Sequence, residues 1–212
     1  MRAWAEAGLR VAGLAAALAL FAALPARAVD TSNLVSDTQF RVCADPANMP
    51  FSNRAEEGFE NRIAEIFAEK LGREVSYTWF PQATGFVRQT LRAAKCDVIM
   101  GYAQGHELVL NTNHYYVSAY VIITRADGPL AEVDRLGDPK LQDARIGIVA
   151  GSPPATHAAR YGLMMQAKPY PLVVDRRHDD PSSQMIADLV AGETDAAVMW
   201  GPIGGWHAKE AD

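Results

Sequence analysis

From residue 38 onward, apolar positions alternate between the two-residue spacing of strands and the wider spacing of helices. The first elements predicted in this way are strand 40–44, helix 58–71, strand 74–80, helix 85–94 and strand 96–100. In the first of these helices, one apolar face is formed by Phe59, Ile63, Ile66, Phe67 and Leu71, with Gly72 as a stop signal. Strands that alternate with helices predict a parallel α/β sheet.

A second alternating set follows a long β-rich run at 115–124. Its predicted elements are strand 145–149, helix 153–165, strand 170–174, helix 181–191 and strand 196–200. We therefore predict an α/β fold of two small lobes, in which lobe 1 spans 29–118, lobe 2 spans 119–200, and residues 201–212 lead back toward lobe 1. Because only this short tail follows Trp200, either the fold is unusually small or the sequence is a fragment.

Residues 1–28 have the pattern of a cleaved secretory signal peptide. Arg2 and Arg10 precede an apolar run at 11–24, and Ala26-Arg27-Ala28 matches an A-x-A cleavage site. The run is about 14 residues long, whereas a membrane-spanning helix needs about 20. An uncleaved anchor is the alternative. We expect a mature chain that begins near Val29 and is periplasmic or secreted.

The charge balance of the chain is acidic. The whole sequence has 20 basic and 25 acidic residues, a net charge of -5. Removal of the signal peptide takes away Arg2, Arg10 and Arg27 together with Glu6, which leaves 17 against 24 and a net charge of −7. An acidic surface without a basic stripe argues against a nucleic-acid partner.

The cysteines of the chain are Cys43 and Cys96. In an oxidising compartment they predict one disulfide, with two buried free thiols as the alternative. Cys43 lies near the end of the first predicted strand, just before loop 45–53, where Asp45-Pro46 and Pro50 limit backbone freedom. We interpret this loop as a rigid wall that presents Phe51 to a ligand.

The loops that follow the predicted strands are rich in glycine, proline and aromatic residues. They are 45–53, 80–85, 101–105, 150–156 and 200–205. Ligands of open α/β sheets bind outside the carboxyl ends of the strands, so these loops predict an aromatic cleft, although each loop alone is compatible with an ordinary turn. The predicted cleft wall is Asp45, Phe51, Trp79, Phe80, Tyr102, Tyr115, Trp200 and Pro202, with Ser152 and Thr156 as hydrogen-bonding groups.

Catalytic and metal-binding patterns are sparse. The five histidines have no metal-ligand spacing, and no nucleophile has a base beside it. The run "DRRHDD" at 175–180 lacks the alternating ligands of a calcium loop, so we interpret it as a solvated surface loop. In "GSPPAT", Ser152 is a candidate helix N-cap, but Pro153 and Pro154 remove N–H donors from any anion cradle. We expect a binding protein with no enzymatic activity, cofactor or metal.

Three segments carry a family resemblance: "GFENRIAEIFAEKLG", "CDVIMG" and "AGETDAAVMW". They resemble the bilobal periplasmic substrate-binding proteins, which implies a type II-like fold with a double-crossover hinge. Amino-acid-binding members carry an arginine after the second segment and an aspartate at the end of the third. This chain has no arginine or lysine at 102–116 and ends the third segment with Trp200. Together with Pro153-Pro154, these departures argue against a free amino acid as the ligand.

A narrower set of segments is "RVCADPANMPFSN", "YTWFPQATGFVRQTL" and "GSPPAT". These resemble the quinoprotein-dehydrogenase-associated branch, the MxaJ and XoxJ proteins, and "GSPPATHAARYGLM" with "AKPYPLVVD" favours XoxJ. The resemblance implies a periplasmic accessory of a PQQ-dependent methanol dehydrogenase of the lanthanide-using XoxF type, with a cytochrome c as a further partner. That family continues beyond residue 212, which implies a C-terminal truncation.

The leading hypothesis is a non-enzymatic accessory protein whose lobes close on an apolar segment of the dehydrogenase and assist its maturation or activation. The alternative is a solute receptor of an ABC-type uptake system, with a small uncharged or aromatic ligand and a permease as partner. Handling of PQQ is a third hypothesis. It would need several arginines in the cleft, and Arg88 is the one candidate.

Overall fold

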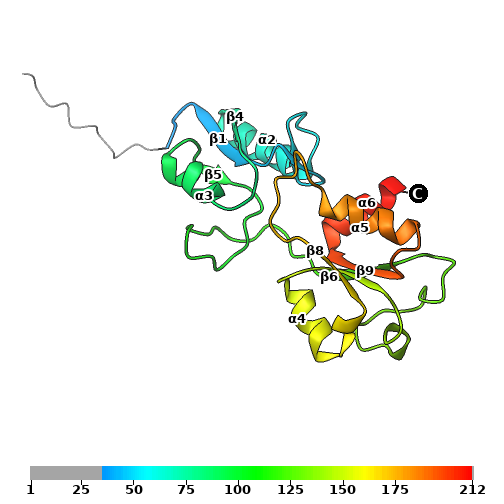
Figure 1. The fold of residues 1–212 in the computed structure, drawn as a ribbon. Coiled ribbons are helices and arrows are strands. Elements are labelled where there is room, and N and C mark those ends of the chain that lie inside the picture. Colours follow the sequence, from blue (N-terminus) through cyan, green and yellow to red (C-terminus); the bar gives the residue numbers. More distant parts are fainter. Residues whose placement is uncertain (1–34, 212) are drawn as a thin grey trace, which may run out of the picture. The chain divides into compact units, whose positions relative to one another are not determined.

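The computed structural model describes residues 35–211, and the predicted signal peptide lies outside this range. The described residues belong to one compact unit, Val35–Asp212. Figure 1 labels their helices and strands. In this part of the chain, no helix is both long and apolar enough to span a membrane.

The first sheet has three parallel strands in the order β4-β1-β5. They are β1 (Gln39–Ala44), β4 (Glu74–Trp79) and β5 (Val98–Ile99). Helix α2 (Phe59–Leu71) packs on β1 and β4 and buries Ala64 and Ala68. Ile66, Phe67 and Leu71, which the sequence placed on the buried face, are exposed. The small alanine side chains allow α2 to lie close to the sheet, so the larger residues are left at its sides.

A short hairpin connects β1 to α2. It consists of β2 (Ala47–Asn48) and β3 (Ser52–Asn53), which pair antiparallel. The buried Asp45 carboxylate accepts hydrogen bonds from the Ala47 N–H at 2.8 Å and the Gln82 N–H at 2.6 Å. Asp45 therefore ties the hairpin to the segment that follows β4.

Cys43 and Cys96 form the predicted disulfide, with their Cα atoms 5.5 Å apart. The bond joins β1 to the turn before β5 and is covered by Phe86 and Val87 of α3 (Phe86–Gln89). Strand β5 pairs with β1 only at Val98 and Ile99. The disulfide is therefore a main support of this edge of the sheet.

The second sheet has four strands in the order β6-β9-β7-β8. They are β6 (Tyr120–Thr124), β9 (Ala196–Trp200), β7 (Ile146–Val149) and β8 (Ala167–Tyr170), and only β6 runs antiparallel to its neighbour.

The helices cover both faces of this sheet. Along β9, Ala196 and Val198 join a core cluster with α4 (Pro153–Arg160), whereas Ala197 and Met199 join one with α5 (Pro181–Val190). Figure 1 shows α4 on one face and α5 on the other. Because successive residues of a strand point to opposite faces, a strand covered on both sides is apolar throughout.

Residues Gly201–Ala211 form helix α6, where the sequence predicted a loop at 200–205 and a path toward lobe 1. The helix packs on α5, β6 and β9. A Cβ atom on Gly204 would lie 2.6 Å from Ile123 Cδ1, so glycine permits this close approach. The loop prediction is wrong because tertiary packing outweighs the weak helix propensity of glycine and proline. The lobe boundary at residue 118 stays a prediction.

Several other predicted elements are shorter than expected. The helix at 85–94 is divided into α3 and a 3-10 turn at Leu91–Ala93, and the buried Thr90 hydroxyl donates to the Phe86 carbonyl at the break. The helix at 153–165 ends at Arg160 and is followed by Gly162, whose φ is 73°. The β-rich run at 115–124 forms a strand only at Tyr120–Thr124, where β9 is available to pair with it.

The strand predicted at 170–174 is wrong. Strand β8 ends at Tyr170, and its register pairs Ala167 with Ile146 and Tyr170 with Val149. Leu172 and Val173 are exposed beyond the end of β7. Their β-propensity misled the sequence interpretation, because a strand forms only where a neighbour supplies hydrogen bonds.

Candidate functional site

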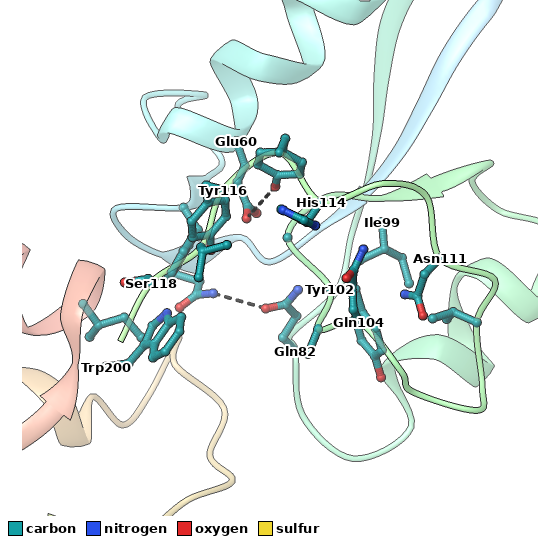
Figure 2. A pocket seen from close by; sticks show the side chains of 18 of the residues that line it. Glu60, Gln82, Ile99, Tyr102, Gln104, Asn111, His114, Tyr116, Ser118 and Trp200 are labelled. Carbon is teal, nitrogen blue, oxygen red and sulfur yellow. Dashed lines mark hydrogen bonds between the residues drawn. The ribbon is translucent and has the colours of Figure 1, made fainter. Parts of the chain in front are cut away.

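A pocket of about 970 Å³ lies at the carboxyl ends of strands from both sheets. Its lining comes from residues that follow β1, β4, β5, β7 and β8, and from Trp200 at the end of β9. Figure 2 shows these side chains, with a large share from the irregular segment 101–118. This is the edge at which open α/β sheets bind ligands.

Half of the predicted cleft residues line this pocket: Phe51, Tyr102, Tyr115, Ser152 and Trp200. Phe51 packs against Phe59 with ring centroids 5.1 Å apart, and Trp200 meets Tyr120 nearly edge-on at 5.2 Å. The pocket thus has aromatic walls from the hairpin after β1 and from the β9 edge.

The predicted hydrogen-bonding groups and two wall residues have other roles. Ser152 occupies the N-cap position of α4, but its hydroxyl donates to the Val149 carbonyl at 2.6 Å and accepts no hydrogen bond from the N–H groups of the helix. Thr156 is exposed on α4, and Pro202 lies in α6. Asp45 is buried, and its carboxylate is satisfied by the N–H groups of Ala47 in the hairpin and of Gln82 after β4.

Trp79 and Phe80 are partly buried, pack against the core of the first sheet and are not among the residues that line the pocket. Trp79 stacks on Tyr77 with ring centroids 4.6 Å apart, and Phe80 packs near Phe86 at 6.4 Å. Tyr77 and Trp79 are two residues apart on β4 and so share the sheet face covered by α2. Strand alternation therefore turns Trp79 away from the pocket.

Glu60 is a pocket residue that sequence reasoning missed. It lies in the first turn of α2, is 6% exposed and accepts a hydrogen bond from the Tyr115 hydroxyl at 3.2 Å. Burial raises the pKa of the Glu60 carboxyl to about 7. Partial burial, together with the neighbouring Glu60, raises the pKa of Tyr115. The available signal was the acidic residue in the "GFEN" segment, which indicated only a helix start.

Gly101 forms the wall behind Glu60. Its φ is +66°, and a Cβ atom there would lie 1.7 Å from Glu60 Oε1. Both the left-handed backbone and this contact require glycine.

We expect Gly101→Ala to lower the free energy of unfolding by about 3 kcal/mol, because strain and steric overlap add. Gly105→Ala is the matched control, since Gly105 has φ +81° but nothing within 4 Å of its Cβ position. The free energy of unfolding of this control should fall by only about 1 kcal/mol. Urea unfolding measures both, and equal losses would contradict a tight contact between Gly101 and Glu60.

Comparison with known proteins decides the family. No protein-family profile matches the chain. Protein MoxJ of Methylorubrum extorquens is 32% identical over 91% of this chain and 70% of its own length. This chain belongs to the MoxJ family. MoxJ of Paracoccus denitrificans is also 32% identical, over 93% of this chain and 71% of its own length.

Structural comparison agrees with this MoxJ-family assignment. The crystal structure of periplasmic binding protein XoxJ from Methylobacterium extorquens AM1 matches with a TM-score of 0.67 and 43% identity. The match covers 81% of this chain and 72% of XoxJ. The predicted type II-like periplasmic binding protein fold and the XoxJ-like assignment are therefore confirmed.

The pocket of this MoxJ-family chain contains the segment that differs from amino-acid-binding proteins. Residues 102–116 carry no arginine or lysine, and residues from this segment, including Val109 and Leu110, line the pocket. Arg176 is a basic residue in the lining that the sequence interpretation overlooked. Its positive charge helps to lower the pKa of His207. The PQQ candidate Arg88 is exposed on α3.

Proposed function

We propose that this MoxJ-family chain is a non-enzymatic periplasmic accessory protein of a PQQ-dependent methanol dehydrogenase. The dehydrogenase is of the lanthanide-using XoxF type, and its cytochrome c is a further candidate partner. The chain closes its pocket on an apolar segment of the dehydrogenase and thereby assists maturation or activation. Membership of the MoxJ family and the likeness to XoxJ support this assignment.

The observation that carries the proposal is the large aromatic pocket. Its volume of about 970 Å³ is at the upper end of the range for small-ligand sites. Tyr115 and Tyr120 in its lining are 42% and 43% exposed. Exposed aromatic rings in a wide groove are typical anchors for a protein segment, because they contribute contact area with few rotatable bonds.

Trp200→Ala tests this function. We expect the affinity for the purified XoxF-type dehydrogenase to fall about tenfold or more, since buried tryptophans dominate many interfaces. Tyr161→Ala is the control, because Tyr161 is an exposed aromatic residue outside the pocket lining. Binding is measured by interferometry with the immobilised chain. If the unmodified chain fails to bind the dehydrogenase, the proposed partner is wrong.

A solute receptor of an ABC-type uptake system is the second candidate. The periplasmic binding protein fold and the pocket volume favour it, because both also fit a small uncharged or aromatic molecule. Thermal-shift screening of metabolites discriminates, since a ligand that binds only the native state raises its apparent stability. A large shift with one metabolite, together with no binding to the dehydrogenase, would favour the receptor.

A further inference from the structure

Two polar side chains of the pocket lining, Asn48 and Glu60, flank Phe51 along the chain. The Phe51 N–H donates to the Asn48 carbonyl at 2.8 Å, and the Glu60 N–H donates to the Phe51 carbonyl at 3.0 Å. These two backbone bonds connect Phe51 to Asn48 and to Glu60. The side chains of all three residues belong to the lining of the same pocket. Both side chains can accept hydrogen bonds, and at least as many aromatic and aliphatic residues as polar ones share the lining with them.

Asn48 has an unsatisfied acceptor. Its Nδ2 group donates to Gln82 Oε1 at 3.2 Å, and Figure 2 marks this bond at Gln82. Its Oδ1 atom has no hydrogen-bond partner among the described residues, although Asn48 is only 8% exposed. Buried polar atoms are normally satisfied, so an unpaired one that lines a pocket points to a donor from a ligand.

Glu60 lacks a positively charged partner within residues 35–211. In the described part of the chain, its carboxylate accepts one hydrogen bond, which the Tyr115 hydroxyl donates to Oε1. By contrast, the acidic pocket residue Asp97 accepts from Arg41 Nε at 3.0 Å. Arg176 and His114 also line the pocket, but neither contributes to the pKa of Glu60, which burial raises to about 7. Buried carboxylates are stable when a cation pairs with them.

We propose that Glu60 and Asn48 bind the side-chain ammonium of a lysine in the partner segment. This inference rests on the proposed function and adds the chemistry that the segment must have: one lysine flanked by apolar residues. An ammonium group has three donors and a compact shape, which suits two separate acceptors. The aromatic lining contacts the aliphatic stem of the lysine and the flanking side chains. The net charge of -5 favours the approach of a basic segment.

The test uses two blocked pentapeptides, leucine-phenylalanine-lysine-phenylalanine-leucine and its analogue with norleucine in place of lysine. Calorimetric titration at pH 8 into the unmodified chain should show about tenfold tighter binding of the lysine peptide, because a charge-assisted hydrogen bond is lost in the analogue. Butylamine is a third probe. If butylamine binds as tightly as the lysine peptide, the site takes a small amine, and the segment proposal is overturned.

Glu60→Gln should reduce the lysine preference to about twofold or less. Glu69→Gln is the matched control, since Glu69 is exposed on the same helix and lies outside the pocket lining. A lysine preference that persists unchanged in Glu60→Gln overturns the proposal. Equal affinities of the two peptides for the unmodified chain also overturn it, and this result does not depend on how the variant folds.

The outcomes separate this inference from the proposed function. If the dehydrogenase binds the unmodified chain and Glu60→Gln equally well, the lysine site is wrong and the accessory function stands. If the lysine peptide is preferred but the dehydrogenase does not bind, the site stands and its partner is another protein.

Discussion

Replacement of both cysteines, Cys43→Ala with Cys96→Ala, is expected to lower the free energy of unfolding by about 4 kcal/mol. The disulfide closes a loop with a sequence separation of 53. In the chain-entropy model, a loop of this length costs the unfolded state about 4 kcal/mol of conformational freedom. Urea unfolding of the variant and of the unmodified chain, each with and without reductant, measures the difference.

The reductant serves as the control for this prediction. It should destabilise the unmodified chain and leave the double variant unchanged, because only the former contains the bond. Hydrogen exchange of segment 98–118 should also rise in the variant, since β5 pairs with β1 through only two residues. A loss of less than about 1 kcal/mol would mean that the unfolded chain is already compact near these residues.

Glu60→Gln is expected to change the pH dependence of stability. The native pKa of about 7 lies above the ordinary 4.5, so the native state binds the proton more tightly than the unfolded state. The protonated Glu60 carboxyl therefore contributes to the free energy of unfolding. This contribution is fully present below the pKa of the unfolded state and is lost as the pH rises through 7. Between pH 5 and pH 8, the free energy of unfolding of the unmodified chain should therefore fall by about 2 kcal/mol more than that of Glu60→Gln.

Denaturant unfolding at pH 5, 6, 7 and 8 provides the measurement for Glu60→Gln. Glu69→Gln removes the same charge from the same helix at an exposed position, so its curve should run parallel to that of the unmodified chain. If the curve of Glu60→Gln also runs parallel to that of the unmodified chain, burial does not raise the pKa of Glu60, and this prediction is wrong. The neighbouring Tyr115 and Tyr116 have raised pKa values and do not titrate in this range.

Elements with strong local signals were predicted well. Strand β9 has the predicted bounds, Ala196–Trp200, because a wholly apolar run is typical of a strand covered on both faces. Helix α5 begins at Pro181 as predicted, after Asp180 caps the N–H groups of Ser182 and Ser183. These signals are local, so they can be interpreted without knowledge of the neighbouring strands.

Candidate site residues were predicted less well, because a loop's position does not determine which way a side chain points. Phe51 and Trp200 line the pocket, whereas Trp79 and Phe80 pack in the core. Glu60 was missed because its burial depends on Gly101 and Tyr115, which are distant in sequence. Helix α6 was missed because Gly204 is explained only by its close approach to Ile123 of β6 and Met199 of β9.

The sequence by itself predicted the alternation of strands and helices, the resemblance to the MxaJ and XoxJ proteins and the one possible disulfide pairing, since periodicity, motifs and a single pair of cysteines are local or countable properties. Only the tertiary structure decided the register of β8, the helical end of the chain and the membership of the pocket. It also placed a buried carboxyl and an unpaired amide oxygen in that pocket. Burial and hydrogen-bond satisfaction depend on contacts between residues far apart in sequence, and folding alone brings those residues together.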